Sequence, residues 1–300
     1  MMKDRADNGA PMEQLLQFPA VEVADIPRTA WDGILCMQNE KNTIEKQIVL
    51  PLTHPEMAQK HGISMPKGIL LFGPPGTGKT AFAKGTSGKL GWKFMEISPS
   101  ALGSGSKKEA FELKIIFENI RLLDRVVVFF DEFEELTVRP DRATKEERAL
   151  SNEFLRQLPR IRGKKDIVLI CATNNIRMLN PALLRPGRFD LILPVGSLDR
   201  ISRKTIFQHN AKDLMTEQLD FDLIAEKTDG FTPADIEAVI ARVSHRAFGL
   251  EVSSGKEFRS TTEDFLSAIS AHHPTISRED MEAFKEDALK YCRADYCGLF

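Results

Sequence analysis

The sequence has few cysteines, no long apolar run and no excess of one charge. Four cysteines among 300 residues are too few for a disulfide framework, so a reducing cytoplasm is the expected compartment. No apolar stretch approaches the ~18 residues that a membrane-spanning helix needs, and residues 1–8 lack the apolar core of a signal peptide. The 41 basic and 43 acidic residues give a net charge of −2, so the composition does not favour nucleic acid or a membrane as partner.

The remaining composition is typical of a soluble globular protein. Hydrophobic residues make up 42% of the chain and charged residues 28%, which are ordinary values for this class. The length of 300 residues exceeds one small domain and suits a large α/β domain with an attached lid. The chain contains no internal repeat and no long low-complexity tract.

The most informative segment is residues 73–80, which read Gly-Pro-Pro-Gly-Thr-Gly-Lys-Thr. They match the phosphate-binding pattern G-x-x-x-x-G-K-[ST], in which glycines let backbone N–H groups approach the phosphates of a nucleotide. Residues 67–72 indicate a buried strand before the loop, and residues 81–84 a helix whose N-terminus favours anions. Lys79 can reach the β- and γ-phosphates, and the Thr80 hydroxyl can bind Mg²⁺. The residues expected to contact the nucleotide here are Pro74, Pro75, Gly76, Thr77, Gly78, Lys79, Thr80 and Ala81.

A second element is an apolar run that ends in acidic residues. Residues 125–130 lack polar alternation, which suits a strand buried on both faces of a parallel sheet. Asp131 and Glu132 follow at the carboxyl end, where such sheets bind ligands. We therefore expect Asp131 to hold the Mg²⁺ shell and Glu132 to polarise a water for attack on the γ-phosphate. A solvated acidic turn is the alternative, because Glu134 and Glu135 come next.

A third strand pattern, residues 166–173, ends at Asn174 and Asn175. The Asn174 amide can hold the attacking water near the γ-phosphate, although asparagine at a strand end also favours an Asx turn. Arg185 and Arg188 follow, and an arginine near a nucleotide can stabilise transition-state charge in its own subunit or in a neighbour. Spacing alone leaves a surface salt bridge as the alternative for each arginine.

Taken together, these residues resemble the AAA-type ATPases of the AAA+ superfamily, in the branch of unfolding and complex-disassembly ATPases. The resemblance extends from about Trp31 to about Arg293. It implies ATP and Mg²⁺ as ligands, Asn174 as the sensor asparagine, and Arg185 and Arg188 as arginine fingers presented to an adjacent subunit. It also implies a homo-oligomeric ring, usually a hexamer. The segments that carry it are residues 66–72, 131–132, 172–174, 180–190 and 230–236.

Two segments depart from the family pattern. Family members begin the domain with a Trp-Asp-Asp-Ile-Gly-Gly-like stretch whose backbone meets the adenine, whereas this chain reads Trp-Asp-Gly-Ile-Leu-Cys around Ile34. Ile34 is the residue that remains for this contact. In the lid, Thr-Pro-Ala-Asp replaces Ser-Gly-Ala-Asp and keeps Ala234. Asn210 or its neighbour His209 is expected to approach the adenine or ribose, with a surface-helix role as the alternative.

The segment between the second strand and the following helix lacks an aromatic residue. Threading relatives carry an aromatic–aliphatic–Gly triplet here, and the aromatic can grip any peptide because it offers a large apolar area at small entropic cost. In residues 98–109 there is no aromatic, and Leu102 is the only large apolar side chain. Phe94 and Phe111 flank the segment and are expected in the core. We therefore expect no generic threading and assign contact with a partner's tail to Leu102, with packing against its own domain as the alternative.

These motifs divide the chain into three parts. Residues 1–29 are polar and are expected to form a flexible N-terminal arm. Residues 30–197 alternate helix and strand patterns, which predicts the parallel sheet and flanking helices of a P-loop NTPase. Strand signals then stop, so residues 198–300 are predicted to form a small helical lid. Within it, Pro233 lies in the first turn of one helix, and Thr261 resembles the cap of another.

The sequence therefore predicts a Mg²⁺-dependent ATPase that forms a ring and remodels an unidentified protein partner. Two alternatives remain. A nucleotide-gated scaffold is one, but such a module would not need Glu132, Asn174, Arg185 and Arg188 together. A nucleic-acid remodeller is the other; the near-neutral charge and the family branch disfavour it, and salt-sensitive DNA binding would support it.

Overall fold

One sheet organises the first of two compact units into which the chain divides. The computed structural model describes residues 8–102, 106–164, 166–185 and 187–292. In this part of the chain, the first unit contains residues 8–73, 79–194 and 287–292, and the second contains residues 74–78 and 195–286. No helix in these ranges is long and apolar enough to cross a membrane.

The sheet has six strands within the described residues, in the order β1-β3-β4-β5-β2-β6. All neighbouring pairs are parallel except β1 with β3. Every residue of β2, β4 and β5 is buried, as the unbroken apolar runs predicted, because helices cover both faces of a parallel sheet. The strands are β1 (Val21–Asp25), β2 (Gly68–Phe72), β3 (Lys93–Ile97), β4 (Val126–Phe130), β5 (Ile167–Thr173) and β6 (Leu191–Pro194).

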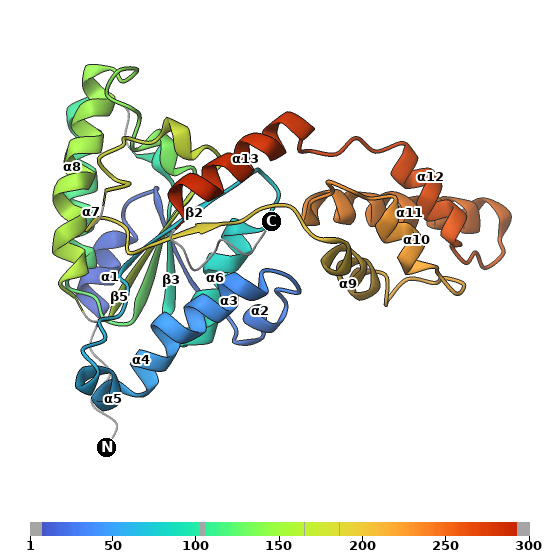
Figure 1. Ribbon diagram of the computed structural model, residues 1–300, viewed down its shortest axis with the longest axis horizontal. Helices are drawn as coiled ribbons and strands as arrows, with labels where there is room; N and C mark the ends of the chain where they lie inside the picture. Colours follow the sequence, from blue (N-terminus) through green and yellow to red (C-terminus); the bar gives the residue numbers. More distant parts are fainter. Residues whose placement is uncertain (1–7, 103–105, 165, 186, 293–300) are drawn as a thin grey trace. The chain divides into compact units, whose positions relative to one another are not determined.

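Helices lie on both sides of this sheet. Helices α1, α7 and α8 cover one face, while α2, α3 and α6 lie on the other (Figure 1). Between the sheet and α7 and α8, phenylalanine rings pack mostly edge to face, and ring contacts of this kind add to the free energy gained by burial. The helices of this unit are α1 (Gly9–Leu15), α2 (Thr29–Asp32), α3 (Gln38–Ile44), α4 (Leu50–Thr53), α5 (Pro55–Lys60), α6 (Lys79–Leu90), α7 (Ser106–Ile120) and α8 (Lys145–Arg162).

The N-terminal region differs from the flexible arm that its composition suggested. Its described part contains α1, whose Leu15 is fully buried, and β1, which extends the sheet antiparallel to β3. Val21 is buried, and at the other end of the strand Asp25 accepts a 2.6 Å bond from Lys93. The pairing was not visible in the sequence because β1 is short and largely exposed, and its partner lies about 70 residues further along the chain.

The second unit consists mainly of helices, in agreement with the predicted helical lid. Pro233 occupies the first turn of α11, and Thr261 caps α12, as predicted. Both helices start with a capping box, in which a threonine and an aspartate three residues later satisfy each other's backbone N–H groups. The helices are α9 (Arg200–Asn210), α10 (Phe221–Glu226), α11 (Pro233–Ser254), α12 (Thr262–Ser270) and most of α13 (Arg278–Tyr291).

Candidate active site

The phosphate loop connects the end of β2 to the start of α6. Gly76 and Gly78 have φ angles of 75° and 97°, in the left-handed region where a residue with a side chain is strained. The Thr77 hydroxyl donates a 2.9 Å hydrogen bond to the Pro74 carbonyl and so closes a turn inside the loop. The glycines of the motif therefore occupy positions whose backbone conformation favours glycine.

Lys79 is the first residue of α6 and is buried, with 7% of its surface exposed. Its Nζ donates a 2.8 Å hydrogen bond to the Gly73 carbonyl at the start of the loop. Burial lowers the pKa of Lys79 to about 8, while the negative charges of Asp131 and Glu134 act in the opposite direction. At neutral pH this is a charged ammonium that has lost most of its hydration, which is a suitable condition for binding phosphate.

The hydroxyl of Thr80 lies next to the carboxylate of Asp131. The Thr80 hydroxyl donates a 2.7 Å hydrogen bond to Asp131 Oδ2, although 51 residues separate the two in sequence. The other carboxylate oxygen, Oδ1, accepts from the backbone N–H of Glu132 at 3.0 Å. A hydroxyl next to a carboxylate is the hard-oxygen combination that Mg²⁺ prefers, so these two residues fit the predicted metal.

Three neighbouring strands bring the predicted residues to one edge of the sheet. In the strand order, β5 lies between β4 and β2, with Phe130 opposite Cys171 and Phe72 opposite Thr173. The residues that directly follow these strands are Asp131, Asn174 and Gly73. The carboxyl edge of the sheet therefore collects the three motifs, as expected for ligand binding in an open α/β sheet.

Glu132 has an unusual backbone conformation. Its φ of 46° and ψ of 45° are left-handed, which costs about 1–2 kcal/mol for a residue with a Cβ. Its carbonyl accepts from the Glu135 N–H at 2.9 Å and starts the 3₁₀ turn Phe133–Glu135. The Glu132 side chain is exposed. A strained, accessible carboxylate two residues beyond β4 agrees with a functional role, because such strain persists where the surrounding structure enforces it.

Asn174 is held through its backbone. Its N–H donates a 3.2 Å hydrogen bond to Glu134 Oε1 in the turn after β4, so the ends of β4 and β5 are linked. The Asx turn that was the alternative for this segment is formed by Asn175, whose Oδ1 accepts from the Arg177 N–H at 3.0 Å. The Asn174 residue itself is exposed.

The two predicted arginine fingers lie in different environments. Arg185 is exposed, whereas Arg188 is half-buried and donates from Nη1 to the Leu155 carbonyl of α8 at 3.2 Å. Asp190 accepts from the N–H groups of Lys67 and Gly68 at 2.8 and 3.1 Å, which fastens this segment to the start of β2. Arg185 is therefore the more accessible of the two.

Ile34 packs closely against α6. A Cβ added to Gly85 would come within 2.5 Å of Ile34 Cδ1, so the glycine makes room for this side chain. Lys41 Nζ donates to the carbonyls of Trp31 and Ile34 at 2.9 and 3.1 Å. The segment around Ile34 is thus fixed next to the helix that follows the phosphate loop, even though the family's two glycines are missing.

The lid residues were predicted from their position in the family pattern. Ala234 lies in the first turn of α11, and a Cβ added to Gly76 would lie 3.1 Å from its Cβ. Asn210 is the half-buried last residue of α9. His209 is also half-buried, and its Nδ1 is shielded from solvent without a hydrogen-bond partner among the described residues.

Two expectations about the segment after β3 are wrong. Leu102 is buried, with 6% of its surface exposed, so its side chain packs against its own domain and is not available to a partner's tail. Phe111 on α7 is 57% exposed rather than part of the core, whereas Phe94 is buried as expected. Residues 103–105 lie outside the described residues.

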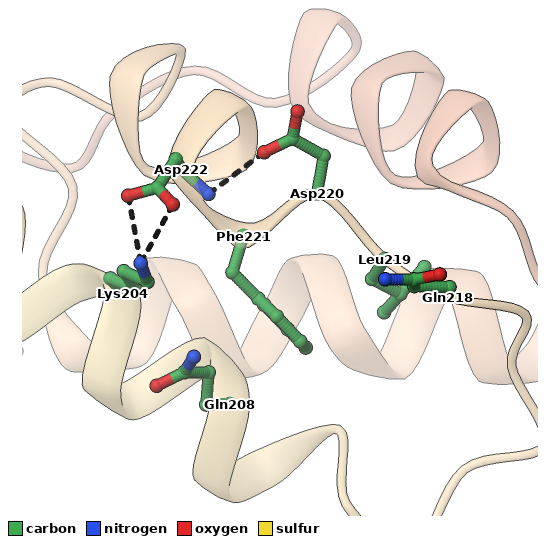
Figure 2. A pocket seen from close by; sticks show the side chains of 7 residues that line it. All are labelled: Lys204, Gln208, Gln218, Leu219, Asp220, Phe221 and Asp222. Atoms are coloured by element: carbon green, nitrogen blue, oxygen red, sulfur yellow. Dashed lines mark hydrogen bonds and ion pairs between the residues drawn. The ribbon is translucent and has the colours of Figure 1, made fainter.

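A separate hollow of about 440 Å³ lies in the second unit, between α9 and the start of α10 (Figure 2). Lys204 donates to both carboxylate oxygens of Asp222 at 2.8 and 2.7 Å. Asp220 accepts from the N–H groups of Asp222 and Leu223 and caps α10. Lys204 and Asp222 thus neutralise each other, Asp220 serves as a helix cap, and none of the predicted nucleotide-site residues lines the hollow.

The sequence motifs did not reveal the role of Glu134 in this site. Glu134 was interpreted only as one member of an acidic turn, yet it binds the Asn174 backbone and acts on the Lys79 charge. The signal that could have found it is the position two residues beyond Glu132, where a 3₁₀ turn can return a side chain toward the sheet.

The comparisons with protein families agree with this geometry. The model of the ATPase family associated with various cellular activities (AAA) matches residues 69–197. The model of the AAA+ lid domain matches residues 218–266. Among solved structures, the AAA domain of FIGL-1 in complex with ADP has a TM-score of 0.78, at 24% identity over 97% of this chain and 99% of that one. It shares the fold.

Curated relatives are found among archaeal ATPases. A cell division cycle protein 48 homolog from Archaeoglobus fulgidus is 32% identical over 89% of this chain and 38% of its own length. A proteasome-activating nucleotidase from Sulfurisphaera tokodaii is 33% identical over 83% of this chain and 64% of its own length. A proteasome-activating nucleotidase from Saccharolobus islandicus is 30% identical over 90% of this chain and 69% of its own length.

The chain covers different shares of the length of these relatives. The chain spans 36–38% of the length of the cell division cycle protein 48 homolog, Protein SAV and Protein CdcH, which are longer proteins. It covers more than two thirds of the Saccharolobus nucleotidase, across both the ATPase and the lid regions. The chain belongs to the ATPase family associated with various cellular activities, the AAA family.

Proposed function

We propose that this chain is a Mg²⁺-dependent ATPase that acts in the cytoplasm as an oligomeric ring and remodels a protein partner. The observation that carries the proposal is the hydrogen bond between Thr80 and Asp131, at the edge of the sheet where the buried ammonium of Lys79 and the carboxylate of Glu132 also lie. A binding site for Mg²⁺, a phosphate-binding cation and a general base are the three parts that hydrolysis of a nucleoside triphosphate requires.

Each residue then has a separate task. Lys79 would bind the β- and γ-phosphates, and the backbone N–H groups of residues 76–81 would surround them, with Pro74 and Pro75 completing the loop. Thr80 and Asp131 would hold Mg²⁺, which when bound would neutralise phosphate charge. Glu132 would take a proton from the attacking water, and the Asn174 amide would orient that water. For the adenine and ribose we propose Ile34, Ala234 and Asn210 as contacts, with His209 as the alternative to Asn210.

The ring and its fingers belong to the same proposal. We propose that Arg185 and Arg188 act on the nucleotide of an adjacent copy, in a homo-oligomer that is expected to be a hexamer. The exposure of Arg185 supports this role, because an arginine finger must extend from its own subunit to the nucleotide of a neighbour. Residues 30–197 would then form the ATPase domain and residues 198–300 the lid.

The partner is proposed to be a protein. The curated relatives include proteins named for proteasome activation and for the cell division cycle, which is consistent with action on proteins. The buried Leu102 and the lack of an aromatic in residues 98–109 argue against generic threading. Remodelling would then depend on a specific partner.

The test separates nucleotide binding from turnover. Glu132→Gln should bind ATP with about parental affinity and lose roughly 10²–10⁴-fold in turnover, because general-base catalysis contributes that much. Lys79→Ala should lose tight binding itself. The exposed Glu146→Gln on α8 serves as control and should keep both properties. Turnover per chain should rise with protein concentration as rings assemble.

Two results would contradict the proposal. Parental turnover by Glu132→Gln would remove Glu132 as the base. Nucleotide-dependent assembly of the parental chain without any phosphate release would instead favour a nucleotide-gated scaffold.

A further inference from the structure

Glu134 lies in the 3₁₀ turn that follows β4. The left-handed conformation of Glu132 reverses the chain at this point, so the turn Phe133–Glu135 folds back at the end of the strand. Glu134 is half-buried, whereas Glu132 and Glu135 are exposed. Of the three glutamates, Glu134 is thus the one whose carboxylate is taken into the protein.

One oxygen of this carboxylate fixes the end of β5. Glu134 Oε1 accepts the Asn174 N–H at 3.2 Å, and this bond joins the residues that follow two adjacent strands. Because this bond restrains the backbone of Asn174, it also restrains the point from which the amide side chain of Asn174 extends. Glu134 is therefore placed to set the position of the residue that we propose as the holder of the attacking water.

The other oxygen is buried and has no hydrogen-bond partner among the described residues. An unsatisfied buried acceptor costs about 1–3 kcal/mol, and more when it belongs to a charged group. A carboxylate oxygen can only accept, so it needs a donor from outside the described side chains and backbone. The negative charge of Glu134 also acts on the ammonium of Lys79, so this carboxylate belongs to the surroundings of the proposed phosphate-binding cation.

We propose that Glu134 is a positioning residue for ATP hydrolysis: Oε1 holds Asn174, and Oε2 accepts a hydrogen bond from a water of the nucleotide-bound site. This inference rests on the proposed function, because it concerns the same water and the same cation. Water is the donor that the site would supply, since Mg²⁺ in nucleotide sites usually keeps several of its waters. Glu134 does not take the proton, which is the task of Glu132.

Two substitutions of Glu134 test the roles of its two oxygens separately, and a third substitution serves as control. Glu134→Gln keeps the length of the side chain and an oxygen for Asn174, but places an NH₂ donor where Oε2 was. Glu134→Asp keeps the charge but shortens the side chain, so the link to Asn174 is lost. Glu135→Gln is the matched control in the same turn, with an exposed side chain and no contact with Asn174 in the structure.

The experiment uses the full chain with three readouts. The first is steady-state hydrolysis, in which both Glu134 variants should lose about 10–100-fold in kcat with KM changed less than about threefold, the range typical for residues that orient the groups around a metal. The second is binding of a fluorescent ATP analogue at varied Mg²⁺ concentration. Here Glu134→Gln should need more Mg²⁺, because the metal's water has lost its acceptor.

The third readout is independent of turnover. Hydrogen exchange of the Asn174 amide in the nucleotide-free protein should remain slow in Glu134→Gln and become faster in Glu134→Asp. A chemical unfolding curve measured in parallel checks that each variant is folded. Glu135→Gln should behave as the parental chain in all three measurements.

The outcomes identify which claim fails. Parental kcat and parental Mg²⁺ dependence in Glu134→Gln would overturn the proposal for Oε2. Unchanged Asn174 exchange in Glu134→Asp would overturn the proposal for Oε1. If the parental chain binds ATP but releases no phosphate, the proposed function is wrong instead. That result is distinguishable because it leaves the exchange of Asn174 untouched.

Discussion

Two basic side chains are almost fully buried in the described part of the chain, one in each compact unit. Lys79 in the first unit is 7% exposed, and Arg203 in the second is 4% exposed. Burial lowers the pKa of both. Their partners differ, and this difference separates a cation that stabilises the fold from one that is suited to a ligand.

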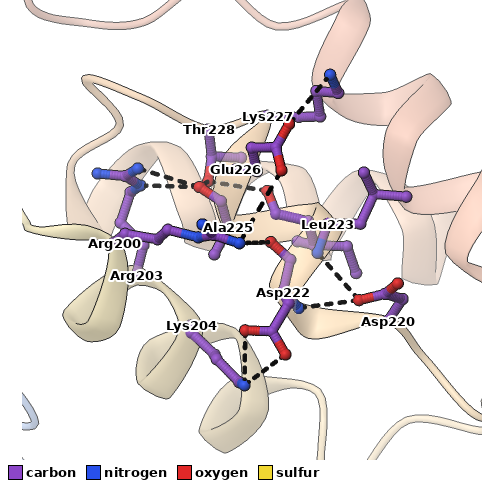
Figure 3. Close-up of polar contacts among 11 residues, drawn as sticks. Arg200, Arg203, Lys204, Asp220, Asp222, Leu223, Ala225, Glu226, Lys227 and Thr228 are labelled. Atoms are coloured by element: carbon purple, nitrogen blue, oxygen red, sulfur yellow. Dashed lines mark hydrogen bonds and ion pairs between the residues drawn. The ribbon is translucent and has the colours of Figure 1, made fainter.

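Arg203 is surrounded by groups of the lid itself (Figure 3). Its Nη1 donates to the Leu198 carbonyl at 2.7 Å, and its Nη2 and Nε donate to the Ala225 carbonyl at 3.0 and 3.4 Å. Asp229 lies 3.6 Å from Nη1. These bonds connect Leu198, two residues before α9, to the last turn of α10, where a cation is also favoured by the helix dipole. A ligand could not improve on this arrangement without breaking it.

One hydrogen-bond partner of Lys79 is a carbonyl of the phosphate loop, and a ligand could take its place. Lys79 donates to the Gly73 carbonyl in its own loop, and its pKa of about 8 shows that the nearby carboxylates compensate only part of the desolvation. A phosphate would supply the missing negative charge. The contrast teaches that the number of buried charges says little about function. What matters is which groups surround the charge: carbonyls that connect two helices of the lid, as at Arg203, or a loop next to acidic residues, as at Lys79.

The largest effect is expected from removing the lid cation. Arg203→Met should lower the free energy of unfolding by about 2–4 kcal/mol, because the Leu198 and Ala225 carbonyls lose the hydrogen bonds of a buried guanidinium. Arg200→Met is the matched control, since Arg200 is exposed and its change should stay within about 0.5 kcal/mol. Urea unfolding at neutral pH measures both. A loss as small for Arg203 as for Arg200 would contradict the structural role.

A buried anion of the lid gives the second test. Asp235 accepts from the Thr232 N–H and hydroxyl, the Thr275 hydroxyl and His272 Nε2, at 2.6–2.9 Å. Burial raises the pKa of Asp235, but the hydrogen bonds from Thr232, Thr275 and His272 together outweigh it, and the net pKa is lowered. Asp235→Asn should therefore lower the free energy of unfolding by about 1–3 kcal/mol at pH 7.

The sign of the pH dependence follows from the lowered pKa. The stabilisation by Asp235 is present above the unfolded-state pKa of about 4 and is lost as the pH falls through the folded-state value. The difference between the parent and Asp235→Asn should thus shrink in acid. The exposed Asp213→Asn provides the control. A difference that stays constant from pH 7 down to the acid transition would show that shape, not charge, explains the loss.

The sheet and the phosphate site could be predicted because their signals are local. An unbroken apolar run, as in β4, is readable without knowledge of its neighbours, and the loop motif specifies its own backbone conformation. Asp131 and Thr80 were predicted separately, and the parallel topology brought them to hydrogen-bond distance. The order of the motifs in the sequence was enough for this part of the site.

What could not be predicted depends on contacts between distant segments. The strand β1 is defined by β3, not by its own composition. The exposure of Leu102 and Phe111 is the reverse of the expectation, since burial depends on which face of α7 and its preceding loop meets the sheet. Glu134 became visible only through the position of Asn174. Each of these cases needed the tertiary structure.

The smallest expected effect is the most direct test of the contrast between the two cations. Lys79→Met should raise the free energy of unfolding of the nucleotide-free protein by about 1–2 kcal/mol, opposite in sign to Arg203→Met. The pKa of Lys79 falls from 10.5 to about 8, or about 2.5 units, which corresponds to about 3 kcal/mol against the charged form at neutral pH. Loss of the polar contacts of Lys79, among them the hydrogen bond to the Gly73 carbonyl, offsets about 1 kcal/mol or more of this gain.

The pH dependence makes this last prediction specific. Between about pH 8 and 10.5 the unfolded state holds a proton on Lys79 that the folded state has released, so the parent becomes more stable relative to Lys79→Met as the pH rises. The advantage of the variant should therefore shrink across this window, in urea unfolding curves measured without nucleotide. Lys204→Met in the lid, whose lysine is paired with Asp222, is the matched lysine-to-methionine control. If Lys79→Met were less stable than the parent at neutral pH, Lys79 would be a structural cation like Arg203, and the distinction drawn from their partners would be wrong.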